Sequence, residues 1–143
     1  MENTDVKMNQ VKIGGRSFPL FFSLRALLNI QKRIQEFNIN NIREITSTFG
    51  NMVKILYILA ENAAKMNGTK LDVDEEWLEL HIPPTNRMVI AIQLGIMKAI
   101  TNGMNMESEQ DEDTDREIDV VLREIQKKSE KTDSHGEKSQ DTD

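Results

Sequence analysis

The stretch Val11–Ile34, VKIGGRSFPLFFSLRALLNIQKRI, decides the fold of this chain. Two short apolar runs flank Gly14 and Gly15, a pair that supplies the positive φ angles of a tight hairpin turn. Pro19 cannot donate a ladder hydrogen bond, so the second run is an edge strand or contains a bulge. Ser23 then stands where a helix begins, and its hydroxyl can accept a hydrogen bond from a free helix N–H group. The stretch therefore predicts a β-hairpin that leads directly into an amphipathic helix.

Four helices are expected after the two strands, because apolar residues recur at three- and four-residue spacing. The strands are expected at 8–13 and 16–22, and the helices at 24–37, from 46 or 47 to 67, at 71–82 and at 85–102. Gly68 and Gly103 provide helix stop signals. The second of these helices is apolar around most of its circumference, so it is either central in a bundle or covered by a second chain. The predicted fold is mainly α, a small helical bundle with a short N-terminal β-hairpin.

Charge divides the chain into two parts. Residues 1–106 carry 12 Lys or Arg against 10 Asp or Glu, whereas residues 107–143 carry 6 against 14. The first part is predicted to be the helical body with its hairpin. The second is an acidic C-terminal tail with few large apolar residues, which cannot offset its own ordering entropy. We therefore expect the tail to be largely disordered, as we do residues 1–7.

One segment of the tail departs from this composition. Residues 115–128, DREIDVVLREIQKK, regain a helical stripe. The apolar residues of this stripe are Ile118, Val121, Leu122 and Ile125. An isolated helix of this length is marginal in water. We expect it to form on contact, by docking on the body, by dimerising or by binding a partner.

Several classes of protein are disfavoured by composition. The chain has no cysteine, so it has neither a disulfide nor a thiolate metal site. The first ten residues, MENTDVKMNQ, contain no apolar signal core, and no apolar run is long enough to span a membrane. The acidic balance argues against a nucleic-acid partner bound by charge. These features are compatible with a reducing cytoplasm.

No arrangement of residues predicts catalysis. His81 lies near Glu79, but the spacing does not form a convergent set of metal ligands. The acids of the segment 72–76 lack the glycine and the terminal glutamate of a calcium loop, and negative charge at a helix N-terminus explains them. Gly14 and Gly15 belong to no phosphate-loop pattern, and no serine stands in a nucleophile elbow. We predict no enzymatic activity, no cofactor and no metal.

Apolar surface is the remaining candidate for function. The stripes exceed what a body of this size needs for its core, and eight Met residues add adaptable surface. Two interpretations stay open: the stripes are entirely internal, or part of them binds a partner. The candidate partner-binding residues are Phe18, Leu20, Phe22, Met52, Leu56, Met88, Ile92 and Met97.

Four segments follow one another in a familiar order: KIGGRSFPLFFSLRALLNI, MVKILYILAENAAK, DEEWLELHI and IAIQLGIMKAI. This layout resembles the tail assembly chaperones of long-tailed bacteriophages and prophages of Gram-positive bacteria. The resemblance covers about residues 8–103 and rests on layout and local pattern. The family's opening hairpin has a glycine turn and a Pro-Leu step, which Gly14, Gly15, Pro19 and Leu20 match.

The resemblance implies a chaperone that binds the tape measure protein and keeps it soluble until the tail tube polymerises. The tail tube protein and a second copy of the chain are further partners, whereas nucleic acid, membrane and cofactor are not expected. Such a protein acts in the cytoplasm of an infected or lysogenic host and is absent from the mature virion. The alternatives are a small helical phage or prophage regulator and a structural adaptor protein. A regulator needs a basic helix, and the first helix offers only Arg25, Lys32 and Arg33.

Overall fold

The computed structural model describes residues 8–106 and 110–141, with side chains as far as Lys128. The chain divides into two units, residues 1–106 and residues 107–143, and each is described by itself. The predicted disorder of residues 1–7 and 142–143 lies outside the described residues.

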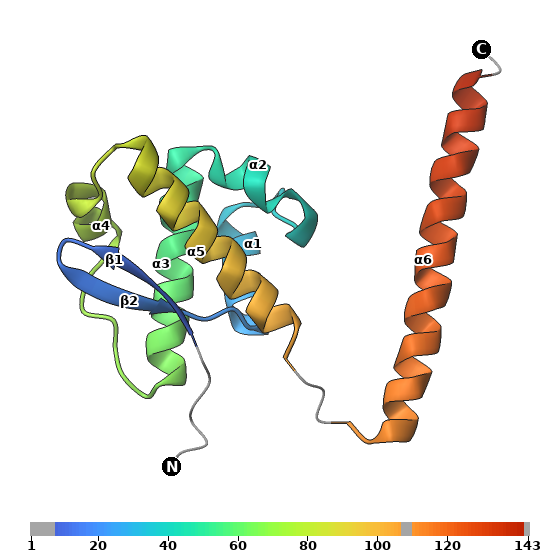
Figure 1. Cartoon of the computed structure of the whole chain (residues 1–143), viewed down its shortest axis with the longest axis horizontal. Helices are drawn as coiled ribbons and strands as arrows, with labels where there is room; N and C mark the ends of the chain where they lie inside the picture. The colour runs from blue at the N-terminus through green and yellow to red at the C-terminus, as the bar shows by residue number, and fades with distance from the viewer. Residues whose placement is uncertain (1–7, 107–109, 142–143) are drawn as a thin grey trace. The chain divides into compact units, whose positions relative to one another are not determined.

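The first unit opens with the predicted hairpin. Strands β1 (Asn9–Ile13) and β2 (Arg16–Leu20) pair antiparallel as a two-stranded sheet (Figure 1). Gly14 and Gly15 have φ angles of 60° and 77°, which confirms their role in the turn. Both strands of a two-stranded sheet are edges, so the missing N–H of Pro19 is tolerated. One face of the hairpin is buried through Val11, Ile13, Phe18 and Leu20.

The elements that follow the hairpin in the first unit are all helical, so the prediction of a mainly α fold with an N-terminal hairpin is confirmed. Its elements are α1 (Leu24–Arg33), the 3-10 turn η2 (Ile39–Asn41), α2 (Ile42–Thr46), α3 (Phe49–Met66), α4 (Glu75–His81) and α5 (Asn86–Met104). Asp74 caps α4 by accepting from the Trp77 N–H, and Thr85 caps α5 by accepting from the Met88 N–H. α3 begins later than expected, because residues Ile42–Thr46 form a separate short helix and the backbone is extended at Thr48, the N-cap residue of α3.

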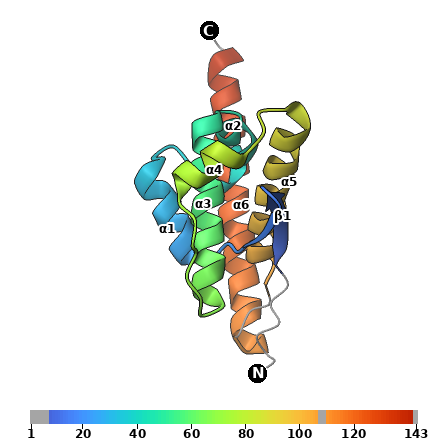
Figure 2. The same cartoon turned by 90° about the vertical axis from the view of Figure 1, so that its left-hand side faces the viewer.

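Helix α3 is the centre of the first unit. It contacts β2, α1, α2, α4 and α5, and Figure 2 shows it between α1 and α5. Its residues Ile55, Leu56, Leu59 and Ala63 are fully buried. The nearly continuous apolar circumference of α3 is therefore explained by its central position.

Helix α5 lies across the front of the unit in Figure 1, with α3 behind it. Two glycines bring its inner side close to the hairpin and to the segment that follows β2. A Cβ atom on Gly95 would lie 2.5 Å from Cγ2 of Val11. A Cβ atom on Gly103 would lie 2.5 Å from the Phe22 carbonyl oxygen. Both approaches are closer than a methyl group permits. Glycine at these two positions therefore allows α5 to lie close to Val11 and Phe22.

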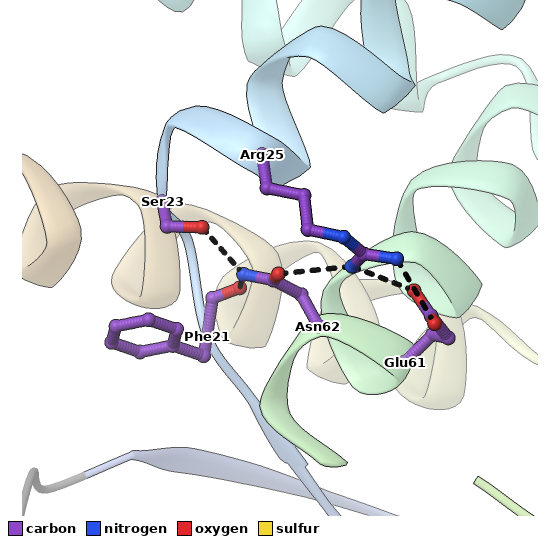
Figure 3. Close-up of polar contacts among 5 residues, drawn as sticks. All are labelled: Phe21, Ser23, Arg25, Glu61 and Asn62. Atoms are coloured by element: carbon purple, nitrogen blue, oxygen red, sulfur yellow. Dashed lines mark hydrogen bonds and ion pairs between the residues drawn. The ribbon is translucent and has the colours of Figure 1, made fainter. Parts of the chain in front are cut away.

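The predicted capping role of Ser23 is wrong in one respect. Ser23 is the N-cap residue of α1, but its side chain makes no capping hydrogen bond. The Ser23 hydroxyl instead accepts from Nδ2 of the buried Asn62 at 2.8 Å, as Figure 3 shows. The same amide nitrogen donates to the Phe21 carbonyl at 3.0 Å. A tertiary contact to α3 has taken the place of the local cap.

The three- and four-residue spacing of α1 predicts an apolar stripe that includes Leu24, Leu28 and Ile30, and only part of this stripe is buried. Leu24 and Leu28 are exposed, whereas Ala26 and Ile30 are buried. Arg25 reaches α3, where it donates to Oδ1 of Asn62 at 3.2 Å and to Glu61 at 3.0 Å (Figure 3). α1 is thus rotated so that Arg25 reaches α3 and the small Ala26 is buried, while two leucines are exposed.

The second unit contains helix α6 (Glu112–Asp141). Asp111 caps it by accepting from the Thr114 N–H at 2.9 Å, which lowers the pKa of that carboxyl. The helix begins before the predicted 115–128 segment and continues beyond it, where the sequence predicts disorder. Residues 129–141 contain one glycine and no proline, so helical backbone geometry is accessible to them. The predicted stripe residues Ile118, Val121, Leu122 and Ile125 are exposed on α6.

Candidate partner-binding surface

The structure places most of the predicted partner-binding residues in the core. Phe18, Leu20, Phe22, Met52, Leu56 and Ile92 are each at most 6 % exposed. Met88 and Met97, both on α5, are half-buried. Of the eight predicted residues, the folded body therefore presents only Met88 and Met97 to a partner. Phe18, Leu20 and Phe22 belong to the core, as the interpretation of entirely internal stripes expects.

Other large apolar residues are exposed on the first unit. They are Leu24 and Leu28 on α1, Phe49 and Met66 at the two ends of α3, Leu80 on α4, Ile90, Leu94 and Met104 on α5, and Met106. Single exposed apolar side chains are normal on a protein surface. A functional candidate is a place where several of them lie in line on one element.

Such a line exists on α5. Ile90, Leu94 and Met104 are 54 %, 49 % and 52 % exposed, and Met97 between them is half-buried. Positions 90, 94, 97, 101 and 104 alternate spacings of four and three residues, so they form one stripe along the helix. We call the four apolar residues of this stripe the α5 outer face. It lies on the opposite side of α5 from the glycine-lined contact with the hairpin.

The two charged residues of α5 that lie beside the α5 outer face are both positive. Arg87 and Lys98 are exposed and lie eleven residues apart, three helical turns, along the same edge of the helix. They are the only charged residues of α5. Among the described residues, neither has an acidic partner. α2, which contacts α5, carries one residue of each sign.

An apolar pocket of about 280 Å³ opens near the start of α5. Phe49, Val53, Ile82, Pro84 and Val89 line it, and Glu79 is its only charged residue. Phe49 is 59 % exposed. The pocket lacks the convergent polar groups of a substrate site, and it suits an apolar side chain.

Aromatic and charged side chains near the hairpin turn form a packed cluster. The His81 ring stacks on the Trp77 ring at 4.0 Å, and Phe18 meets Trp77 edge-on at 5.7 Å. Arg16 lies over both Phe18 and Trp77 and forms an ion pair with Asp72 at 2.6 Å. The hydrogen bond from Arg16 lowers the pKa of the Asp72 carboxyl. This cluster attaches the hairpin turn to α4. Packing on Trp77 therefore explains the presence of His81 without a bound ligand.

The described residues contain no group of three or more His, Cys, Asp or Glu side chains placed to hold a metal ion. Within the same part of the chain, no helix combines the length and the apolar character that crossing a membrane requires.

Sequence reasoning found Met97 but missed the rest of the α5 outer face, because α5 carries apolar residues on two sides. Ile92, Ile96 and Ile100 face the core, whereas Ile90 and Leu94 face outward. The signal was present in Gly95: a glycine within a helix marks a close approach, which identifies its own side as the packed one. Residues on the other side are then available for binding.

Comparison of the chain with protein-family models, with curated proteins and with solved structures finds no match.

Proposed function

We propose that this protein is a phage tail assembly chaperone that binds the tape measure protein and keeps it soluble until the tail tube polymerises. One observation carries the proposal: the first unit has a complete core, and yet α5 exposes a stripe of large apolar side chains. The sequence resemblance supplies the identity of the client.

The geometry suits a long helical client. A stripe at alternating four- and three-residue spacing matches the repeat of an amphipathic helix, which binds by laying its apolar side along such a surface. Exposed apolar stripes of this kind mark protein interaction sites. Release requires no nucleotide if tube polymerisation competes for the same apolar surface of the client.

The charge of α1 gives little support to the alternative of a nucleic-acid-binding regulator. Arg25 is paired with Glu61, and Arg33 is paired with Glu75. Lys32 is the remaining basic residue of the helix. A helix that contacts phosphates needs several free cations on one side, because phosphate neutralisation supplies most of the affinity.

Co-expression with the tape measure protein of the same genome tests the proposal. We expect the unmodified chain to keep the client in the soluble fraction. Leu94→Glu should weaken client binding by about tenfold, or roughly 1.4 kcal/mol, and so lower the soluble fraction. Gln31→Glu, an exposed charge substitution on α1, is the matched control. Met52→Glu is unsuitable, because Met52 is 2 % exposed and a buried charge would unfold the body.

Circular dichroism and urea denaturation of each variant establish that it is folded. A folded Leu94→Glu variant that solubilises the client as well as the unmodified chain would contradict the role of the α5 outer face. Mass spectrometry of purified virions gives an independent check. Recovery of the chain from finished particles in stoichiometric amount would contradict the role of an assembly chaperone.

A further inference from the structure

The charges along the α5 outer face carry information about the helix that binds there. The face offers apolar side chains over about four turns, from Ile90 to Met104. Its only flanking charges on α5 are Arg87 and Lys98, which lie on one edge and have no acidic partner among the described residues. A helix that docks here meets two cations on one side.

We propose that the α5 outer face binds an amphipathic client helix whose apolar stripe is bordered on one edge by acidic residues, and that Arg87 and Lys98 select it. The inference rests on the proposed chaperone function and adds the chemistry of the partner. The apolar residues provide the affinity, which is common to all amphipathic helices. The two cations provide the discrimination, because opposite charges favour docking and like charges oppose it.

The same arrangement sets the direction in which the client lies. Both cations lie on one edge of the face. A helix with one acidic edge can therefore contact both cations in only one of the two directions in which its apolar stripe can lie on the face. A helix bordered by Lys or Arg along the same edge is repelled at both positions. The cost of that repulsion falls as salt screens the exposed charges, since the Debye length is about 10 Å at 0.1 M ionic strength.

Two synthetic peptides of about 20 residues, close to the 19 residues of α5, test the inference with the full chain. They share one apolar stripe of Leu and Ile at alternating four- and three-residue spacing and differ only in Glu or Lys along one edge. Fluorescence anisotropy with labelled peptides measures both dissociation constants. We expect the Glu peptide to bind about tenfold more tightly at low salt and this advantage to shrink as salt is added.

Charge reversal of the protein provides the matched arm of the experiment. The double variant Arg87→Glu/Lys98→Glu is expected to bind the Lys peptide more tightly than the Glu peptide. Lys32→Glu, an exposed change on α1, is expected to leave the preference unaltered. Leu94→Glu is expected to weaken both peptides, because both use the apolar stripe.

Equal binding of the two peptides by the unmodified chain, or a preference that survives the double charge reversal, would overturn the inference. Two other occupants of the face are also distinguishable. A dimer of the free chain that Leu94→Glu converts to a monomer would assign the face to a second copy. Binding to vesicles of anionic lipid that the same variant abolishes would assign it to a membrane surface. Either result would overturn the inference.

Failure of the inference and failure of the chaperone function give different results. If the peptides show no charge preference while Leu94→Glu still removes client solubilisation, the chaperone function stands and the selection by charge falls. If the Glu peptide binds selectively while the tape measure protein is never solubilised, the charge-selective site stands and the client has been misassigned.

Discussion

Helices α3 and α5 are nearly equal in length, 18 and 19 residues, and both are rich in aliphatic residues, yet they occupy different environments. α3 is surrounded by β2 and by α1, α2, α4 and α5. α5 contacts α3, α2 and the hairpin on its inner side and leaves Ile90 and Leu94 exposed. Apolar circumference by itself therefore does not separate a core helix from a binding helix. The placement of the neighbouring elements makes the difference, because those of α5 leave its outer side exposed.

The largest contrast is expected from truncating one leucine on each helix. Leu59 on α3 is fully buried, so Leu59→Ala removes packed methyl groups, leaves a cavity and should lower the free energy of unfolding by about 2–5 kcal/mol. Leu94 on α5 is 49 % exposed, so Leu94→Ala should cost less than about 1 kcal/mol. Urea denaturation followed by circular dichroism measures both values. Similar losses for the two variants would mean that the outer side of α5 is covered and that the comparison is mistaken.

Much of the fold follows from the sequence through local signals. Gly14 and Gly15 adopt the predicted turn, and the helix before Gly68 ends close to its expected place. The predicted stop at Gly103 is wrong, because α5 continues through it to Met104. Such signals act within a few residues, so one sequence is enough to detect them. The start of α3 was displaced because the segment before it forms a separate helical turn.

The rotation of the helices, and with it the candidate site, could not be predicted in the same way. The buried side of α1 is the one that packs on α3, where Arg25 contacts Glu61 and Asn62, 36 and 37 residues away in the sequence. Which side of α5 is buried depends on the hairpin packing against Gly95. Both are long-range contacts, and periodicity contains no information about them. Residues that the sequence pattern alone does not distinguish therefore lie partly in the core and partly on the surface.

A second test compares one glycine on each helix and is expected to give effects of opposite sign. A Cβ atom on Gly95 of α5 would lie 2.5 Å from the buried Val11, so Gly95→Ala should lower the free energy of unfolding by about 1–3 kcal/mol. Gly50 of α3 has no neighbouring atom within 4 Å of such a Cβ. Gly50→Ala should therefore raise stability by up to about 1 kcal/mol, since alanine loses less backbone entropy in a helix. Thermal denaturation of both variants provides the measurement, and a stabilising Gly95→Ala would refute the close packing of α5 on the hairpin.

The smallest expected effect concerns the polar contact that holds α3 against the start of α1. Asn62 is 4 % exposed, and its amide donates to the Phe21 carbonyl and the Ser23 hydroxyl. Asn62→Ala leaves that buried carbonyl without its side-chain donor and should lower the free energy of unfolding by about 1–2 kcal/mol. Glu61→Ala removes only the partner of Arg25 in a half-exposed ion pair, so it should cost well under about 1 kcal/mol.

Chemical denaturation of these two variants beside the unmodified chain separates the two contributions. If Asn62 fixes the junction, Asn62→Ala should also increase amide exchange at the first turn of α1, whereas Glu61→Ala should leave exchange there unaltered. Equal losses for the two variants would instead assign the junction to the Arg25–Glu61 pair. In that case the rotation of α1, which exposes Leu24 and Leu28, would depend on a surface charge contact and should weaken as salt is added.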